Sequence, residues 1–243
     1  MRNYVLSDAY KVNLNSGTDG YQPKYQRNGY WYKLDSESGE GYTEALVSRL
    51  LSYSTLPKST YVHYEYCKIN GKEGCRSKSF TATNEEFISF DSLYSTYIGG
   101  NLQTELNLLS AKDRYNLLLD IGRKCCNLDL SVYFRAIFLL DYLIENIDRH
   151  TKNIGVIYNE NKGIFRIAPI FDNGRSLRIG LSPSEKGFSR TISGSFAEQL
   201  IISSGFPVKP IFKVRLGSCL NDPVIAKHQF LVSQLKSNIK LLS

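Results

Sequence analysis

The sequence lacks a long apolar segment, an internal repeat and a secretory leader. No apolar run approaches the roughly 20 residues that cross a membrane. Residues 1–8 have neither the charged head nor the apolar core of a signal peptide. We therefore expect a globular protein without a membrane span, made in the cytoplasm and at first resident there. Its 243 residues suffice for one large domain or two small ones.

Cysteines do not occur in a pattern that suits cross-links or zinc. The five cysteines are an odd number, Cys125 and Cys126 are adjacent, and no Cys-x-x-Cys pair occurs. This argues against a disulfide framework and against a cysteine zinc site. Most of the five are expected to be reduced and buried. Cys67 and Cys75 flank a predicted hairpin turn, so a cross-strand disulfide is an alternative if the protein leaves the cell.

Motifs of nucleic-acid-binding proteins are also missing. The formal net charge is +7 and there are 17 tyrosines, but the basic residues are scattered. No dense Lys/Arg run, zinc finger or aromatic–basic RNA signature is present. A modest positive excess equally suits a protein that binds a nucleotide or an acidic substrate. A nucleic-acid partner is not expected.

One ordered set of polar residues stands out in the second half of the chain. Asp148 is followed by Asn153, and Asp172 comes after a predicted hairpin of residues 154–167. Phosphoryl transfer depends on positioning and charge neutralisation, for which a base and a few oxygen ligands of Mg²⁺ suffice. Asp148 is the candidate base, and Asn153 and Asp172 are the candidate Mg²⁺ ligands. Their order predicts a phosphotransferase.

Each half of this set also has a purely structural interpretation. Asp148 and Arg149 are able to form an ordinary ion pair at the surface. The Asp-Asn-Gly sequence of residues 172–174 is also typical of a turn. The order of the two halves, with a hairpin between them, favours the chemical interpretation.

The N-terminal region has features of a nucleotide-binding lobe. Residues 13–24 are polar and rich in small residues, which let backbone N–H groups approach phosphate oxygens; the candidates are Ser16, Gly17, Gly20, Gln22 and Lys24. Residues 29–34 predict a strand that places Lys33 near the phosphates. Apolar spacing in residues 42–51 predicts a helix with Glu44 in its first turn. Glu44 is expected to pair with Lys33, although helix dipoles also favour such a glutamate.

Further patterns predict the remaining elements. Strands are expected at residues 60–69 and 75–80, joined by an Asn-Gly turn. Residues 83–86 have the capping-box pattern that begins a helix. The crossover near residues 80–83 divides the chain into an N-lobe of residues 1–82 and a C-lobe of residues 83–243.

The C-lobe is expected to be mainly helical. Ser110 begins one helix by its capping box, and Ser131 begins a buried central helix of residues 132–147 that leads to Asp148. Two further helices are predicted at residues 196–204 and 223–242.

A segment rich in serine, arginine and glycine follows Asp172. Residues 175–195 occupy the place of an activation or substrate-binding segment, in which Arg175, Arg178 and Arg190 are suited to hold a phosphate. A solvated loop is the alternative.

These motifs together resemble the HipA-like kinases. The resemblance covers residues 13–180 and is most specific in the Asp148-Arg149-His150-x-x-Asn153 sequence and in residues 168–177. The Asp-Asn-Gly-x-Ser-Leu sequence is most similar to a secreted, pro-inflammatory branch of Ser/Thr kinases.

The resemblance implies a fold, an activity and partners. The fold would be α+β and bilobed, protein-kinase-like, with a small antiparallel-sheet N-lobe and a mainly helical C-lobe. ATP would be the phosphate donor and Mg²⁺ the metal. Ser/Thr residues of proteins, including the chain itself, would accept the phosphate, and a host protein and non-classical secretion would follow for a secreted relative.

Two departures keep other functions open. HipA toxins have Asp-Asp-His where this chain has Asp-Arg-His, a form that also resembles the phosphoinositide kinases. A lipid or small-molecule acceptor is therefore an alternative, and His150 competes with Asp148 as the base. The chain also lacks the extra N-terminal domain of those toxins, which weakens the inference of an antitoxin partner. A non-catalytic, pseudokinase-like binding module is a further alternative.

Overall fold

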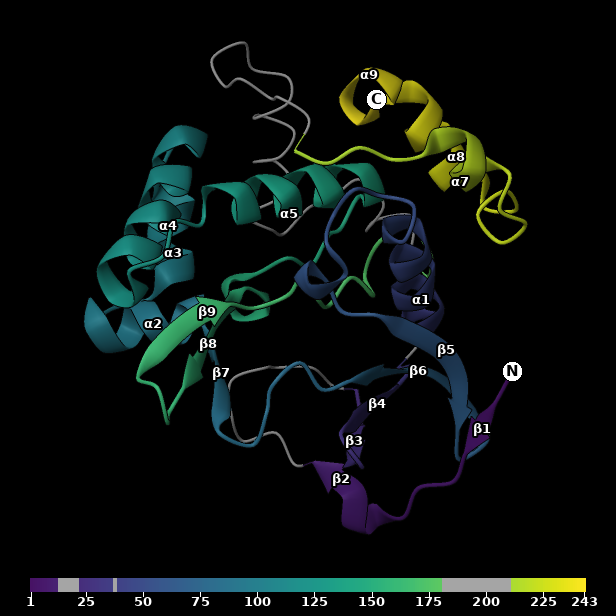
Figure 1. Ribbon diagram of the computed structural model, residues 1–243, viewed down its shortest axis with the longest axis horizontal. Helices are drawn as coiled ribbons and strands as arrows, with labels where there is room; N and C mark the ends of the chain where they lie inside the picture. The colour runs from purple at the N-terminus through teal and green to yellow at the C-terminus, as the bar shows by residue number, and fades with distance from the viewer. Residues whose placement is uncertain (13–21, 37–38, 181–210) are drawn as a thin grey trace.

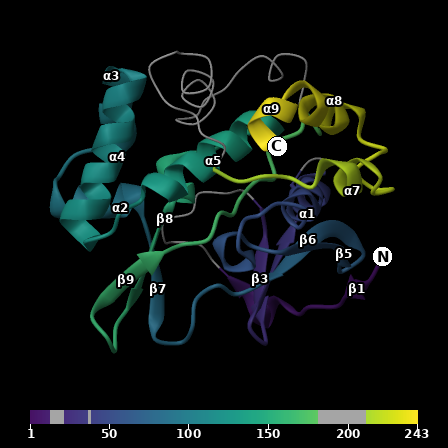
Figure 2. The same ribbon diagram turned by 45° about the horizontal axis from the view of Figure 1, so that its top comes forward.

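The computed structural model describes residues 1–12, 22–36, 39–180 and 211–243. Strands β1–β6 gather in one part of the molecule and helices α2–α5 in another, with α1 between the sheet and the C-terminal helices (Figures 1 and 2). The fold is therefore mixed α+β, as the sequence predicts.

A six-stranded sheet forms the N-terminal part. Its strands are β1 (Asn3–Tyr4), β2 (Lys11–Val12), β3 (Lys24–Arg27), β4 (Tyr30–Leu34), β5 (Tyr64–Ile69) and β6 (Lys72–Lys78). Their order is β1-β5-β6-β4-β3-β2, and every pairing is antiparallel except that of β1 with β5. The predicted turn between β5 and β6 is present: Asn70 and Gly71 have φ of 51° and 81°, the left-handed values that such a tight hairpin requires.

The register of β5 and β6 rules out the alternative of a Cys67–Cys75 disulfide. Cys67 lies opposite Gly74, and Cys75 lies opposite Tyr66. Because neighbouring strand positions point to opposite faces, the two cysteines belong to different apolar clusters. Both are buried free thiols, and burial raises the pKa of Cys67 to about 11. That alternative was wrong because the two residues are one position out of register.

Helix α1 (Glu40–Leu51) packs on this sheet. It starts slightly before the predicted position, at a turn where Gly39 has a φ of 77°. Gly41 lies against β6 so closely that a Cβ there would be 2.5 Å from the carbonyl carbon of Gly74. The absence of a side chain at Gly41 thus lets the helix approach the sheet.

The predicted helix at residues 83–86 is wrong, because this stretch leads into a strand. Strand β7 (Glu85–Ser89) joins β8 (Gly155–Asn159) and β9 (Ile164–Ile167) in an antiparallel sheet of order β7-β8-β9. Glu85 does accept a hydrogen bond from the Ala82 N–H at 3.1 Å, as in a capping box. Its carboxylate, however, also pairs at 2.6 Å with Arg166 of β9, and backbone pairing with β8 overrides the local signal. The β8–β9 hairpin itself confirms the prediction for residues 154–167.

Four helices follow in the order α2 (Phe90–Tyr97), α3 (Leu102–Leu108), α4 (Ala111–Cys126) and α5 (Ser131–Ile144). Ser110 caps α4 as predicted, accepting the N–H of Asp113. The central helix α5 is buried nearly all round. It ends at Ile144 rather than at residue 147, because Glu145 adopts a left-handed backbone with φ of 47°.

The C-terminal region differs from the predicted single helix at residues 223–242. It forms α7 (Leu216–Leu220), α8 (Gln229–Ser237) and α9 (Ile239–Leu242). The His228 ring accepts the N–H of Leu231 at 3.2 Å and so starts α8 late. Asp222 caps only a short turn, accepting the N–H groups of Val224 and Ile225. The helix predicted at residues 196–204 lies outside the described residues.

The largest apolar cluster joins α1 to the helices and to the C-terminal segment. It includes Leu46 and Leu50 of α1, Phe134 and Ile137 of α5, and Leu231 of α8. The division into residues 1–82 and 83–243 stays a prediction. Within the described part of the chain, no helix has both the length and the apolarity needed to span a membrane.

Candidate active site

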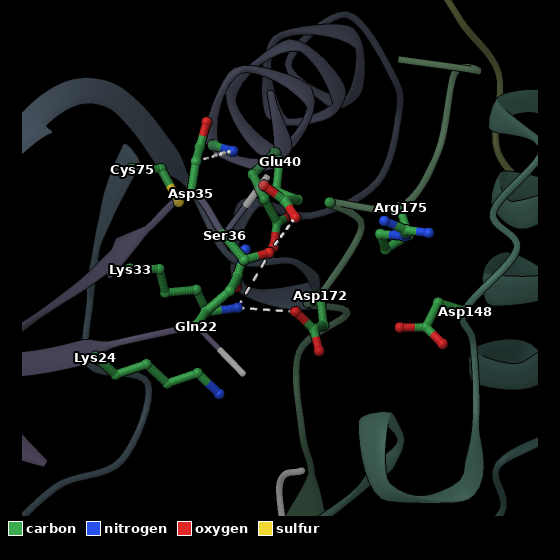
Figure 3. A pocket seen from close by; sticks show the side chains of 13 residues that line it. Gln22, Lys24, Lys33, Asp35, Ser36, Glu40, Cys75, Asp148, Asp172 and Arg175 are labelled. Atoms are coloured by element: carbon green, nitrogen blue, oxygen red, sulfur yellow. Dashed lines mark hydrogen bonds and ion pairs between the residues drawn. The ribbon is translucent and has the colours of Figure 1, made fainter. Parts of the chain in front are cut away.

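A cavity of about 210 Å³ opens where the large sheet faces the loops that follow α5 and β9 (Figure 3). Seven of the residues singled out in the sequence line it: Gln22, Lys24, Lys33, Glu44, Asp148, Asp172 and Arg175. They come from the β3–β4 hairpin region, from α1 and from two loops of the C-terminal half. Ser16, Gly17 and Gly20 lie outside the described residues.

Lys33 is the centre of the charged groups in the cavity. It lies on β4, and its Nζ is 2.9 Å from Asp172 Oδ1 and 3.5 Å from Glu44 Oε1. Burial opposes the charge of the ammonium group, but the carboxylates of Asp172 and Glu44 prevail and raise the pKa of Lys33 well above its usual value. Lys33 is therefore a fixed positive charge, and the contact with Glu44 that the sequence predicted is present.

Glu44 joins the helix to the loop that carries Asp172. Its carboxylate is buried, with 2% of the residue exposed, and Oε2 accepts the backbone N–H of Asn173 at 3.0 Å. Burial raises the pKa of Glu44, the charge of Lys33 counteracts this, and Asp172 adds to the rise. Through these contacts α1 sets the position of both Lys33 and the loop at Asp172.

Asp172 has an unusual backbone conformation and a strongly stabilised charge. Its φ is 61°, in the left-handed region that aspartate tolerates better than most residues. Burial alone would raise its pKa, but Lys33 and Lys24 lower it below the ordinary range. In Figure 3 both lysines approach from the sheet side, and Asp148 lies on the opposite side. Asp172 therefore stays ionised.

Asp148 faces the cavity from the loop after α5. Its backbone N–H donates to Asn146 Oδ1 at 3.0 Å, and its side chain reaches solvent. The surrounding walls of the cavity raise its pKa, His150 opposes this, and Asp172 adds to the rise. Because the carboxylate still contacts water, we expect it to be ionised at neutral pH.

Asn153 and His150 lie beside the cavity without lining it. Asn153 is buried and donates from Nδ2 to the backbone carbonyl of Asp148 at 3.2 Å. Its amide oxygen is the atom suited to a metal. His150 is half-buried. The structure therefore brings Asp148 into the cavity but not His150.

The most important residue that sequence reasoning misinterpreted is Arg149. The surface ion pair of Asp148 and Arg149 is wrong, because the guanidinium is 1% exposed and pairs with Asp141 of α5 at 3.1 Å. It also donates to Asn173 Oδ1 at 2.6 Å and to the backbone carbonyl of Phe171. Arg149 thus ties the loop of Asp148 to the loop of Asp172. Asp141, the single acidic residue of apolar α5, was the available signal.

Two further contacts hold the loop of Asp148, one to α5 and one to the loop of Asp172. Asn146 donates to Asp141 Oδ1 of α5 at 3.1 Å. The N–H of Ile147 donates to the carbonyl of Arg175 at 3.0 Å. The two loops are therefore held as one unit.

The cavity also contains residues that sequence reasoning missed, namely Asp35, Ser36, Glu40, Gly41, Cys75 and Gly174. Of the arginines predicted to hold a phosphate, Arg175 lines the cavity. Arg178 instead pairs with Glu145 at 2.7 Å on the surface, and Arg190 lies outside the described residues. Of the segment of residues 175–195, the structure describes residues 175–180, and residues 181–195 lie outside the described residues.

Comparisons with known proteins were made for the whole chain. No family model matches it. The serine/threonine-protein kinase CtkA of Helicobacter pylori strain J99 is 35% identical over 104 residues, which are 41% of this chain and 30% of CtkA. A crystal structure of a proinflammatory kinase CtkA from Helicobacter pylori matches with a TM-score of 0.50 and 19% identity. That match covers 72% of this chain and 61% of the other.

These comparisons bear on fold and on the general kind of activity. The chain spans less than two thirds of the length of either matched protein. The predicted resemblance to such kinases is confirmed, as is the α+β, protein-kinase-like fold. The chain is similar to CtkA in sequence and in fold, and this similarity supports a kinase-like function.

Proposed function

We propose that this chain is an ATP- and Mg²⁺-dependent Ser/Thr protein kinase. The observation that carries the proposal is the meeting of Lys33, Glu44 and Asp172 through contacts of 2.9 and 3.5 Å in a cavity that Asp148 also lines. These residues come from a strand, a helix and two loops that are far apart in the sequence. Such convergence of opposite charges around an open cavity is expected of a site that positions and neutralises phosphates.

The donor set fits a magnesium ion with ATP. The carboxylate of Asp172 and the amide oxygen of Asn153 are the hard ligands that Mg²⁺ prefers, and this ion usually keeps phosphate and water as its other ligands. The described residues contain no group of three or more His, Cys, Asp or Glu side chains that would form an all-protein metal cage. When bound, MgATP supplies the phosphoryl group and neutralises charge on it.

The remaining roles follow from charge and position. Lys33 holds phosphate oxygens, and Glu44 keeps its ammonium group in place through the contact at 3.5 Å. Gln22 and Lys24 line the same side of the cavity and contact the phosphates. Asp148, ionised and open to the cavity, accepts the proton of the serine or threonine hydroxyl.

Asp148 is a better candidate for the base than His150 because only Asp148 lines the cavity. Arg149 has a structural role between two loops, so the Asp-Arg-His sequence gives little support to a lipid acceptor. Autophosphorylation, release from the cell and action on a host protein are further proposals that rest on the resemblance.

The test is a comparison of Asp148→Asn with His150→Gln. We expect Asp148→Asn to lower phosphoryl transfer to protein by about 10²- to 10⁴-fold, the usual contribution of a general base, while ATP affinity changes little. We expect His150→Gln to keep its rate at neutral pH. Full activity of Asp148→Asn would remove the proposed base. Labelled phosphate found only on lipid vesicles would replace the protein acceptor with a lipid.

A further inference from the structure

One wall of the cavity is acidic and has no part in the proposed phosphoryl transfer. Asp35, Ser36 and Glu40 line it at the point where β4 passes into α1 (Figure 3). Glu40 is only 6% exposed, and both carboxylates lie close to the helix start. This pair of carboxylates, one buried and one half-buried, requires an explanation, because buried polar atoms normally have hydrogen-bond partners.

Local hydrogen bonds around the start of α1 explain one oxygen of each carboxylate. Asp35 Oδ1 accepts the N–H of Gly41 at 2.7 Å. Glu40 Oε1 accepts the hydroxyl of Ser36 at 2.7 Å. The bond from Gly41 satisfies one backbone N–H in the first turn of α1, whereas the bond from Ser36 joins two side chains. Acidic groups are favourable at that end of a helix.

The second oxygen of each carboxylate is not explained by capping. Asp35 Oδ2 and Glu40 Oε2 are buried and find no hydrogen-bond partner among the residues that the structure describes. Burial and the charge of Glu40 also raise the pKa of Asp35. Gly174 packs on Glu40, where an added Cβ would lie 3.1 Å from Glu40 Cβ, so the loop after β9 closes over this wall. Two residues that line the cavity thus each have a buried acceptor without a donor.

We propose that Asp35 and Glu40 bind a basic side chain of the protein substrate, preferably arginine, near the serine or threonine that is phosphorylated. This subsite rests on the proposed kinase function. A guanidinium offers several N–H donors in one plane, which suits two carboxylates that each have an unused oxygen. A Mg²⁺ ion is also able to bind one or two carboxylates, and the test below separates it from a guanidinium.

The position of the pair favours a substrate side chain over an unrelated cation. Asp148 lines the same cavity, on the far side of Asp172 from the sheet (Figure 3). A peptide whose hydroxyl lies at Asp148 therefore enters the same cavity that the acidic wall lines. The subsite would select acceptors that have a basic residue close by.

The test measures binding of two labelled peptides to the intact protein by fluorescence anisotropy at physiological salt. Both contain one central serine, flanked by arginines in one and by alanines in the other. We expect the arginine peptide to bind about tenfold more tightly, as a charge-assisted hydrogen bond provides. Glu40→Gln and Asp35→Asn keep the capping oxygens and remove one charge each, so the preference should fall to about twofold in each variant.

Glu160→Gln is the matched control, because Glu160 is exposed in the β8–β9 turn and its loss changes the net charge equally. It should keep the full preference. Equal binding of both peptides to the wild type, or a preference that Glu160→Gln also loses, would overturn the subsite. The subsite is also overturned if Mg²⁺ without nucleotide abolishes the preference of the wild type for the arginine peptide. Asp35 and Glu40 would then hold a metal ion.

A parallel phosphoryl-transfer assay with the alanine peptide separates this inference from the proposed function. Transfer without a binding preference refutes the subsite alone. A binding preference without transfer to any protein refutes the kinase and retains a cation-binding wall.

Discussion

Arg149 is a full charge inside the protein, and its partners explain how it is tolerated there. The guanidinium is bonded to Asp141, to Asn173 and to the carbonyl of Phe171. A buried ion pair adds little net stability compared with apolar residues of the same size, but loss of one partner leaves the other charge uncompensated. Arg149 therefore matters more for the relative position of the two loops than for the total stability.

The first prediction concerns this pair. Arg149→Met should lower the free energy of unfolding by about 3–5 kcal/mol, because Asp141 would remain buried without a counter-charge. The free energy of unfolding should fall less in the double variant Asp141→Leu, Arg149→Met than in the single variant. Urea denaturation of the three proteins measures both effects. A loss below about 1 kcal/mol in the single variant would show that the pair is not buried as described.

The second prediction concerns the pH dependence of the proposed base. Burial raises the pKa of Asp148 above its ordinary 3.8, and His150 lowers it. A base acts in its deprotonated form, so the rate should fall as the pH drops, with a midpoint above 3.8. Removal of His150 takes away a stabilising charge, so the midpoint in His150→Gln should move to higher pH.

The rate–pH profiles of the wild type and His150→Gln check this shift. An unchanged acidic limb would mean that His150 does not act on Asp148. Loss of the limb together with the activity would mean that His150 itself is the base.

At the scale of elements, the C-terminal segment holds the end of α1. The N–H of Thr55 donates to the carbonyl of Lys213 at 2.8 Å, and that of Arg215 donates to the carbonyl of Tyr53 at 2.9 Å. Asp222 accepts hydrogen bonds from Arg49 and from the Tyr53 hydroxyl. Figures 1 and 2 show α7 beside α1. Because α1 also carries Glu44, this segment helps to fix the charged cluster of the cavity.

The third prediction is the pH dependence of that attachment. Hydrogen bonds from Tyr53 and Arg49 outweigh burial and lower the pKa of Asp222 to about 2, against 3.8 for a free carboxyl. Because the folded pKa is the lower one, the stabilisation is present above pH 3.8 and is lost as the pH falls to about 2. Asp222→Asn should therefore lower Tm near neutral pH, and its difference from the wild type should shrink in acid.

Thermal unfolding of both proteins from about pH 7 down to about pH 2 covers this window. A difference in Tm that does not change over that range would mean that the charge of Asp222 contributes nothing to the attachment.

The sequence was sufficient for elements that local signals determine. The Asn-Gly turn, the Ser110 cap and the β8–β9 hairpin all depend on residues close together in the chain, and all are present. Glu85 was misjudged because its strand depends on β8 and Arg166, which come much later in the chain. The C-terminal region was read as one helix because nothing in its apolar pattern revealed the breaks at His228 and Asn238.

The site was predictable to a similar degree. The order of Asp148 and Asp172, the predicted strand of Lys33 and the predicted helix of Glu44 single out these four residues, and the structure places all four at one cavity. The acidic wall escaped notice because Asp35 and Glu40 appear in the sequence only as residues around a turn and a helix start. Their unmet hydrogen-bonding capacity is a property of the folded chain.

At the scale of the whole molecule, the cavity lies between the large sheet, which has its own apolar cluster, and parts that belong to the largest cluster. Its lining comes from both the large sheet and the loops of the C-terminal half, and α1 belongs to the same apolar cluster as α5 and α8. A ligand bound here lies between the large sheet, α1 and the loops that carry Asp148 and Asp172. Binding should therefore stabilise the molecule as a unit.

The fourth prediction follows from this coupling. MgATP at about a hundred times its Kd should stabilise the folded state by about 2.7 kcal/mol, which raises Tm by roughly 5–10 °C for a chain of this size. Lys33→Met should remove most of this rise, because it deletes the fixed charge that faces the phosphates. Differential scanning fluorimetry of both proteins with and without MgATP measures the rise in Tm. An equal rise in Lys33→Met would place the nucleotide elsewhere.

The most direct test of the central claim is mass spectrometry of the purified protein and of added casein after incubation with ATP and Mg²⁺, with Asp172→Asn as the control. The proposed function predicts phosphate on serine or threonine with the wild type and none with the variant. Phosphate with both the wild type and Asp172→Asn would contradict the role of Asp172. If the wild type leaves both itself and casein without phosphate while ATP is still bound, the proposal of a protein kinase is contradicted.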